Sequence, residues 1–424
     1  MSSRPIIIVT GANNGIGFGT CRRLLDQLSQ PHPTDAKPQF PPNEGQVDQG
    51  FTYPCDGLTL IMACRNAQRA EAARDKLLKT FEKDVQRRRH EPGHLAQAKK
   101  FRENLEIKIH KLDLASVQSV LEFGDEIGRT YPYISRVIFN AGVAPFLRLQ
   151  WAALIKQIFT DFLGAATSPR FYVEEVGLTS DDGLGWVWQC NVFGHYVLYR
   201  VLQPLLAASA NDTTGPGRVI WVSSLEALPE FFDKEDWQLI KTAHPYEASK
   251  FQVELIGTHL DTIARQDPDP KVRHLVVHPG VVYSSIDAAL IPPILHELKH
   301  LVFYLARWFG SPNHPITHLH GAAAAVHVAL VSIACIPLLF ATASKSNSVR
   351  SAGFAHGGVL PSEDNPVRFH SITDRWGNDA VGVDYVHGWD ECKEAARNLE
   401  AQHSALYKKF LAAEGRKQEG GTSD

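Results

Sequence analysis

Short runs of apolar, largely β-branched residues alternate along this chain with longer stretches in which apolar positions recur at a helical period. A run that is apolar on both faces is typical of a strand in a parallel sheet covered by helices on both sides. Residues 6–9 form such a run, and further strands are predicted at 58–64, 105–110, 136–139, 218–222 and 272–277. Their alternation with helical stretches predicts an α/β fold with a doubly wound parallel sheet and helices on both faces.

The helical stretches lie between these runs and continue after the last of them. They cover residues 16–28, 67–103, 115–130, 186–206, 246–264, 293–309 and 389–414. We expect a catalytic core at 1–285, lid or membrane-contact helices and the last sheet-covering helix at 286–360, and a C-terminal extension with an amphipathic helix at 361–424. Within the core, the proline- and glycine-rich segment 31–57 is expected to be a surface loop insertion, partly disordered.

The first strand runs directly into a glycine-rich turn that opens the first helix. Glycine is required where φ is positive or where a phosphate approaches the backbone. The start of the following helix presents free N–H groups and a positive dipole end, which favour a pyrophosphate. We therefore predict a dinucleotide site, and an ordinary glycine-rich surface loop is the less favoured interpretation. Its residues are Gly11, Asn13, Asn14, Gly15, Ile16 and Gly17.

The overall composition argues against several classes of function. The net charge of −3 speaks against a nucleic-acid partner. The six cysteines have neither CxxC nor zinc-ligand spacing, which indicates reduced thiols in a reducing compartment. His314, His318 and His320 have no carboxylate or cysteine beside them, so we expect no metal.

Six short motifs occur along the chain, each next to one of the predicted strands or helices. They are Thr10-Gly11-x3-Gly15-Ile16-Gly17, Asn140-Ala141-Gly142, Asn191, Ser224, Tyr246-x3-Lys250 and Pro279-Gly280. Together they resemble the motif set of the short-chain dehydrogenase/reductases over roughly residues 5–285, and this resemblance implies a Rossmann-like core. Less generic stretches resemble the fungal 3-ketosteroid reductases of sterol C-4 demethylation. These are residues 189–194, 303–307 with 310–312, and an aromatic-rich insertion at 151–182.

The resemblance implies a role for each catalytic residue. Tyr246 would protonate the ketone oxygen, and Lys250, one helical turn away, would lower the pKa of Tyr246 and hold the nicotinamide ribose. Ser224 would hydrogen-bond the substrate carbonyl, and Asn191 would hold a water that relays protons. The separation of Ser224 from Tyr246 is longer than in many members of the family, so Ser223 is an alternative for the serine role.

Arg65 follows the second strand, where an acidic residue would select NAD and an arginine can pair with the 2′-phosphate of NADP. No acid stands beside Arg65, so we expect NADP(H) as the cofactor. Asp113 is expected to accept from the adenine amino group, and the Asn140 segment to pack along the adenosine. The remaining cofactor contacts are predicted at Pro279, Gly280 and Ser284 or Ser285.

The resemblance implies an NADPH-dependent 3-ketosteroid reductase that converts the C-3 ketone of C-4-demethylated sterol intermediates to the 3β-hydroxysterol in ergosterol biosynthesis. It also implies partners in the sterol C-4 demethylation complex, namely the C-4 methyl oxidase, the C-3 decarboxylating dehydrogenase and a scaffold protein. Peripheral association with the cytosolic face of the endoplasmic reticulum membrane, or with lipid droplets, is expected. Two alternatives stay open: a reductase or dehydrogenase for another lipophilic carbonyl, retinoid- or steroid-like, and a non-catalytic scaffold.

Two apolar segments bear on membrane contact. Residues 293–309 form an amphipathic helix that can serve as a lid over the pocket, lie in the bilayer surface, or both. Residues 322–343 carry no formal charge and are long enough to span a bilayer. A histidine, a serine and a proline interrupt them, so we expect a helix buried against the sheet and treat a true span as the minor alternative.

Overall fold

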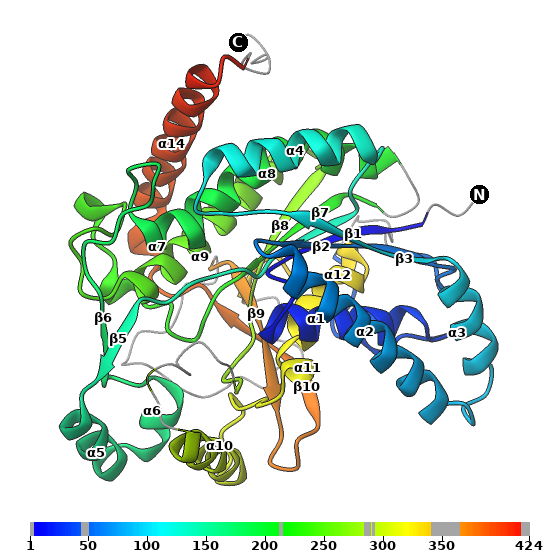
Figure 1. Ribbon diagram of the computed structural model, residues 1–424, viewed down its shortest axis with the longest axis horizontal. Helices are drawn as coiled ribbons and strands as arrows, with labels where there is room; N and C mark the ends of the chain where they lie inside the picture. Colours follow the sequence, from blue (N-terminus) through cyan, green and yellow to red (C-terminus); the bar gives the residue numbers. More distant parts are fainter. Residues whose placement is uncertain are drawn as a thin grey trace.

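A computed structural model describes residues 4–43, 51–211, 215–283, 290, 293–340 and 365–416. Its centre is an eight-stranded sheet with the strand order β10-β9-β8-β7-β4-β1-β2-β3 (Figure 1). Every neighbouring pair is parallel except β9 and β10, which are antiparallel. The strands of this sheet are β1 (Ile6–Thr10), β2 (Leu58–Cys64), β3 (Leu105–Lys111), β4 (Arg136–Phe139), β7 (Gly217–Val222), β8 (Val272–His278), β9 (Val367–Thr373) and β10 (Asp379–Tyr385).

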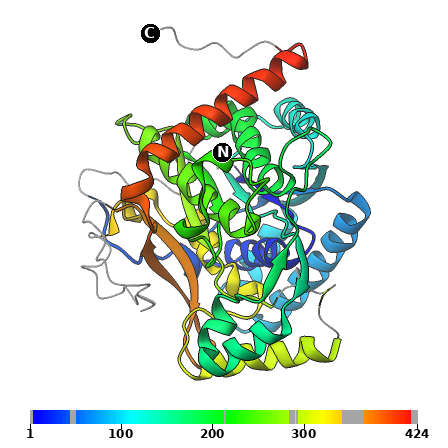
Figure 2. The same ribbon diagram turned by 90° about the vertical axis from the view of Figure 1, so that its left-hand side faces the viewer.

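Helices cover both faces of the sheet. One face carries α4 (Val117–Thr130), α8 (Gly194–Ala208) and α9 (Pro245–Ala264), with α14 (Trp389–Ala413) packed on α9. The other face carries α1 (Gly15–Leu28), α2 (Ala67–Arg87), α3 (His94–Glu103), α11 (His318–Gly321) and α12 (Ala323–Leu330). Figures 1 and 2 show the two helical layers with the sheet between them.

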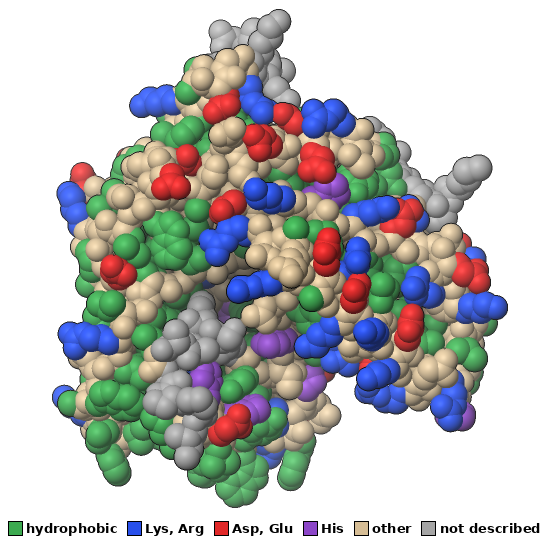
Figure 3. Space-filling model, viewed as in Figure 1, with side chains coloured by type: hydrophobic (Ala, Val, Ile, Leu, Met, Phe, Trp, Pro, Cys, Tyr) green, Lys and Arg blue, Asp and Glu red, His purple; other side chains and the backbone are tan. Residues whose placement is uncertain are grey.

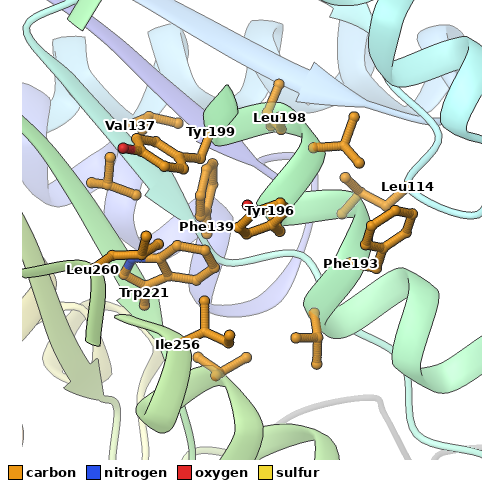
Figure 4. Packing of buried hydrophobic residues seen from close by; sticks show 14 of the residues in the cluster. Leu114, Val137, Phe139, Phe193, Tyr196, Leu198, Tyr199, Trp221, Ile256 and Leu260 are labelled. Atoms are coloured by element: carbon orange, nitrogen blue, oxygen red, sulfur yellow. The ribbon is translucent and has the colours of Figure 1, made fainter. Parts of the chain in front are cut away.

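The alternation of side chains along β1 connects the two halves of the core. Ile6 and Ile8 belong to the cluster under α4, α8 and α9, whereas Ile7 and Val9 belong to the cluster under α1, α2 and α12. In the first cluster, aromatic residues of neighbouring strands meet the helices, as Figure 4 shows for Phe139. Because both faces of β1 are buried, its sequence is an uninterrupted apolar run.

The expected strands and helices before residue 285 are confirmed, with small shifts at their ends. The predicted helix at 67–103 is two helices, because the chain turns at Gly93 with φ 72°. The stretch at 322–343 forms the short buried helix α12, which packs on the sheet as expected; residues 341–343 lie outside the described part. Among the described residues, no helix has the length and apolar character needed to cross a membrane.

Helix α12 ends above two arginines that are fully buried at the start of their strands. Arg136 Nε donates to the carbonyl of Ala329 at 2.8 Å, and Arg218 Nη1 donates to the carbonyls of Val328 and Val331 at 2.6 and 2.7 Å. The last carbonyls of a helix have no partner within it, and its C-terminal dipole favours a cation. These two guanidinium groups therefore satisfy the helix end at the bottom of the sheet.

The described part of the expected loop at 31–57 is irregular apart from one short 3₁₀ turn, and several of its side chains are buried. The Phe51 ring lies 4.5 Å from the Arg136 guanidinium, and the Tyr53 hydroxyl donates to the carbonyl of Leu330 at 3.1 Å. Asp35 pairs with Arg23 of α1. These contacts attach part of the segment to Arg136, to the end of α12 and to α1, while many of its other described residues are exposed. Residues 44–50 lie outside the described part.

Strands β9 and β10 were not expected from the sequence. The run Val367–Thr373 contains arginine, histidine, serine and threonine, and it is nevertheless buried. Arg368, Ser371 and Thr373 hydrogen-bond to distant elements. Apolar and polar positions do not alternate regularly along this run, so the pattern did not mark it as a strand. The two strands extend the sheet beyond β8, as the long hairpin in Figure 2 shows.

Candidate active site

The strand order reverses between β1 and β4, and a cavity of about 680 Å³ lies beyond the carboxyl ends of the strands. Open α/β sheets bind their ligands at this position. The cavity brings together residues from every motif found in the sequence except Asn191, whose side chain lies just behind the wall. The predicted site residues that line it are Gly11, Asn13, Asn14, Gly15, Ile16, Arg65, Asp113, Asn140, Ser224, Tyr246, Lys250, Pro279 and Gly280.

The glycine turn has the geometry that a phosphate-binding turn needs. Gly11 and Gly15 have φ values of 65° and 56°, which side chains rarely tolerate. A Cβ on Gly17 would lie 2.4 Å from the carbonyl oxygen of Gly11 and 2.5 Å from Nδ2 of Asn140. Gly17 therefore lets α1 approach the turn, whereas space remains open beside Gly15 at the cavity wall.

Thr10 and His195 connect three motifs, and the sequence prediction missed both. The Thr10 hydroxyl accepts from the backbone N–H groups of Asn140 and Ala141, both at 2.9 Å. His195 Nδ1 lies 3.1 Å from the carbonyl of Asn191, which can only accept, so Nδ1 carries the proton and Nε2 accepts from Thr10 at 3.1 Å. Burial lowers the pKa of His195 to about 3, which keeps the ring neutral.

The catalytic candidates converge where α9 crosses the end of β7. Ser224 lies close enough to the Tyr246 side chain to act on its pKa, which it lowers. Lys250 Nζ donates to the carbonyl of Val222 at 3.0 Å and lies 5.9 Å from the centre of the Tyr246 ring. Ser223, the alternative serine, instead donates to Glu254 at 2.8 Å. The structure thus brings Ser224, and not Ser223, to the tyrosine.

The electrostatic setting of Tyr246 differs from the expectation. Burial raises the pKa of Tyr246, and the nearby carboxylates of Glu226, Glu247 and Glu174 raise it further, while Ser224 lowers it. Burial lowers the pKa of Lys250 to about 8. Burial and the three acidic neighbours dominate the pKa of the tyrosine, and the expected lowering by Lys250 is not seen in this cavity.

Asn191 lies in a π-helical turn, η2 (Gln189–Phe193), between the short helix α7 (Trp186–Trp188) and α8. Its Oδ1 accepts from the Val143 N–H at 2.8 Å, and its Nδ2 donates to the Val143 carbonyl and to Ser249, both at 2.9 Å. Single π-helical turns occur frequently at functional sites. The turn fixes the Asn191 amide beside α9; its predicted role as the holder of a water stays a prediction.

Behind the catalytic residues lies a buried ion pair that the sequence did not predict. Glu254 of α9 accepts from Arg368 of β9 at 2.8 Å, and both side chains are almost completely buried. The same Glu254 oxygen accepts from Ser223, and Arg368 also pairs with Asp384 of β10. The hairpin of β9 and β10 therefore holds α9, which carries Tyr246 and Lys250, against the end of β7.

The residues at the end of the cavity beside the glycine turn, here called the cofactor end, fit a nicotinamide dinucleotide. Arg65 is exposed at the end of β2, and Asp113, at the end of β3, accepts from the Ala115 N–H at 3.0 Å. Asn140 donates to the carbonyl of Thr10 at 3.0 Å, which holds its segment beside the glycine turn. Ser284 and Ser285 lie outside the described residues.

The other end of the cavity is apolar and is formed by two segments outside the generic motifs. The insertion and the residues just before it supply the antiparallel pair β5 (Phe146–Leu149) and β6 (Tyr172–Glu174) and the helices α5 (Trp151–Thr160) and α6 (Phe162–Thr167). Helix α10 (Pro293–Trp308) packs on α6. The apolar wall consists of Leu149, Leu154, Ile158, Phe162, Phe171, Leu295, Leu298, Val302 and Phe303. This end suits a large, mostly hydrocarbon ligand.

Known proteins agree with this description. No family model matches the chain. A 3-keto-steroid reductase from Kluyveromyces lactis is 29% identical, with 78% of this chain and 82% of that protein aligned. A human protein named 3-keto-steroid reductase/17-beta-hydroxysteroid dehydrogenase 7 is 27% identical, with 73% and 74% aligned.

Among solved structures, salutaridine reductase from Papaver somniferum aligns with a TM-score of 0.46 at 16% identity, covering 77% of this chain and 96% of that chain. The sheet order and the ordered motifs, together with the sequence relatives, carry the assignment. Over most of its length the chain is similar to the fungal 3-keto-steroid reductases, and its sheet order and ordered motifs resemble those of the short-chain dehydrogenase/reductases.

Proposed function

We propose that this chain is an NADPH-dependent 3-ketosteroid reductase that converts the C-3 ketone of sterol intermediates to the 3β-alcohol. One observation carries the proposal: Tyr246, Ser224 and Lys250 meet at the point where a dinucleotide site opens into a large apolar pocket. The names of the sequence relatives support the same substrate class.

The chain's residues account for the proton chemistry. NADPH, when bound, supplies the hydride. Ser224 hydrogen-bonds the ketone oxygen, and Tyr246 transfers its hydroxyl proton to that oxygen, so that the product is a neutral alcohol. Because the pKa of Tyr246 is raised, its hydroxyl stays protonated at neutral pH and is ready to donate. Lys250 provides a positive charge beneath the ring as the tyrosinate forms.

The test is NADPH oxidation with a 4-methyl-3-ketosterol in detergent, comparing the wild type with Tyr246→Phe. We expect the 3β-alcohol as product and a fall in kcat of roughly 10²–10⁴ in the variant, the usual contribution of a general acid. A 17-ketosteroid in parallel tests the second activity that the human relative's name contains. Cofactor binding without turnover of any 3-ketosterol would contradict the proposal and favour another lipophilic carbonyl or a scaffold role.

The preference for NADPH rests on Arg65, the exposed cation at the end of β2 that lines the cavity with Asn13 and Asn14. A guanidinium pairs well with the 2′-phosphate that distinguishes NADP from NAD. We expect Arg65→Ala to weaken NADPH binding about tenfold, the value of one lost charged contact, and to leave NADH binding nearly unchanged. Equal losses for both cofactors would argue against this role.

We also infer contact with a phospholipid surface at the pocket mouth. Helices α5 and α10 lie at the same edge of the molecule in Figures 1 and 2 and expose large apolar side chains there, as Figure 3 shows along its lower edge. These include Trp151, Ile155, Phe159, Leu298, Leu301, Tyr304 and Trp308. Since a sterol ketone resides in lipid, a bilayer is the occupant that fits this surface.

Co-sedimentation with phosphatidylcholine vesicles tests this surface. The double variant Phe159→Asp with Trp308→Asp should lose binding, whereas Leu95→Asp, at an exposed apolar site on α3, should retain it. Equal binding by both variants would contradict a role for α5 and α10. Partnership with other enzymes of sterol C-4 demethylation and a location at the endoplasmic reticulum are part of the same proposal, and co-purification from membranes tests them.

A further inference from the structure

Two carboxyl groups meet beside the first turn of α9. Glu174, the last residue of β6, is only 5% exposed, and its Oε2 accepts from the backbone N–H of Tyr246 at 2.8 Å. Glu247, the residue after Tyr246, is within hydrogen-bonding reach of the Glu174 carboxyl. The insertion that forms the substrate wall therefore also touches the helix turn that carries the catalytic tyrosine.

This contact replaces a missing helix cap. His244, at the N-cap position of α9, makes no side-chain capping bond, and Pro245 has no N–H group. The N–H of Tyr246 is consequently the first free donor of the helix, and Glu174 satisfies it from a segment far away in the sequence. A cap is worth about 1 kcal/mol and fixes the path of the first turn.

The carboxyl pair contains two oxygens that no donor reaches. Glu174 Oε1 and Glu247 Oε2 are both buried and have no hydrogen-bond donor among the described residues. Two ionised carboxylates in contact would repel each other, and each buried acceptor without a donor costs free energy. One proton on the pair turns one of these oxygens into a donor to the other and satisfies both.

We propose that Glu174 and Glu247 share one proton, and that this pair is a positioning element that holds the first turn of α9, and with it Tyr246, against the β5–β6 hairpin. The inference rests on the proposed function of the site and deepens it. The β5–β6 hairpin would then help to position the catalytic tyrosine as well as line the substrate pocket. A second contact agrees with this, because the Phe146 ring of the hairpin lies 6.0 Å from the Tyr246 ring.

The charges around the pair agree with a single proton. Burial raises the pKa of Glu174, and the Glu247 charge raises it next, with a smaller contribution from Glu226 on the chain after β7. The N–H of Tyr246 acts in the opposite direction. His244 Nδ1 lies 3.5 Å from Glu247, and its half-exposed ring, which also faces Glu230, connects the pair to solvent.

The shared proton also affects the tyrosine. Glu174, Glu226 and Glu247 all raise the pKa of Tyr246. A pair that carries one negative charge in place of two limits this effect, so that the tyrosine can still release its proton to a substrate oxygen.

Glu174→Gln, Glu174→Ala and the neighbouring exposed control Glu175→Gln test the proposal. Glutamine supplies an acceptor for the Tyr246 N–H and a donor to Glu247 without a titrating proton. Glu174→Ala should speed hydrogen exchange of the amides in the first turn of α9 and lower kcat about tenfold, with NADPH affinity unchanged. Glu174→Gln should restore slow exchange and most of kcat.

Two readouts report the proton itself and need no turnover, so they separate this inference from the proposed function. Infrared spectra of the wild type at neutral pH should contain a buried protonated-carboxyl band that Glu174→Gln lacks and Glu175→Gln keeps. Because the folded state holds a proton that the unfolded chain releases, the Tm of the wild type should fall as pH rises above the ordinary glutamate range, and Glu174→Gln should flatten this slope.

The inference is overturned if the band is missing from the wild type or if the slope is the same in Glu174→Gln. Its positioning part is overturned if exchange and kcat are unaffected in Glu174→Ala. If the alanine variant does not fold, Glu174→Met takes its place, because it keeps most of the side-chain volume but offers no oxygen to the Tyr246 N–H, and the same faster exchange and lower kcat are expected.

Discussion

The two ends of the cavity are built in different ways. At the cofactor end, β1, the glycine turn and α1 are consecutive in the chain, and the backbone itself forms the binding surface. At the catalytic and substrate end, the wall comes from the insertion and α10, while β9 and β10 support α9 from behind. The comparison teaches that the first end depends on local conformation and the second on contacts between distant segments.

Removing the ion pair by which β9 supports α9 should have the largest effect on stability. Arg368→Met leaves Glu254 buried without its partner, and the loss of one partner of a buried ion pair typically costs about 3–5 kcal/mol. We expect a corresponding loss in the free energy of unfolding, measured by urea denaturation. Arg375→Met, an exposed site in the same hairpin, is the control and should change stability by less than about 0.5 kcal/mol. Equal effects would mean that the ion pair does not hold the hairpin.

The second-largest effect is expected at the cofactor end, where the glycine turn depends on local conformation. In Gly17→Ala the new Cβ would lie 2.4 Å from the Gly11 carbonyl oxygen, so the turn must shift. An overpacked site costs about 1–3 kcal/mol, and we expect NADPH affinity to fall roughly 10- to 100-fold in a fluorescence titration. Gly128→Ala, which meets no atom within 4 Å on α4, should bind NADPH normally. Normal binding by both variants would show that close approach at Gly17 is not needed.

The pH dependence probes the boundary between the two ends, at Lys250. Burial lowers the pKa of Lys250 to about 8, so its charge is present below that pH and is lost above it. If the charge assists the tyrosine, kcat/KM should fall as pH rises through about 8, approaching tenfold for each further unit. Lys250→Arg keeps its charge in this range, so the fall should move to higher pH, whatever the absolute rate. A fall that stays at the same pH in this variant would assign it to another group.

The smallest expected effect tests the contribution of α10 to substrate binding. Val302 of α10 lines the apolar wall, and Val302→Ala removes part of that surface. The substitution removes two carbon atoms from a half-buried side chain, a loss worth about 1 kcal/mol, so KM for the sterol ketone should rise about fivefold. The Kd for NADPH should stay constant, because the cofactor end does not use α10. A parallel loss of NADPH affinity would show that the two ends are coupled.

Much of the site was predictable because its signals are local. A glycine with positive φ, a helix that begins with free N–H groups, and a tyrosine and a lysine one turn apart are properties of neighbouring residues. The six strands of the main sheet before residue 285 were also predicted, and in β1 and β2 burial on both faces leaves nearly uninterrupted apolar runs.

What tertiary structure decided lies where polar groups are buried beside distant partners. The sequence of β9 is largely polar, yet Arg368 is buried, because Glu254 of α9 neutralises its charge. Glu174 reads as a surface acid, yet it caps the helix of Tyr246. The sequence alone determined the nucleotide-binding turn and the catalytic helix, because both depend on local conformation. Only the fold decided which distant charges and aromatic rings surround them. A buried polar residue needs partners, and its neighbours in the chain do not reveal which partners it will have.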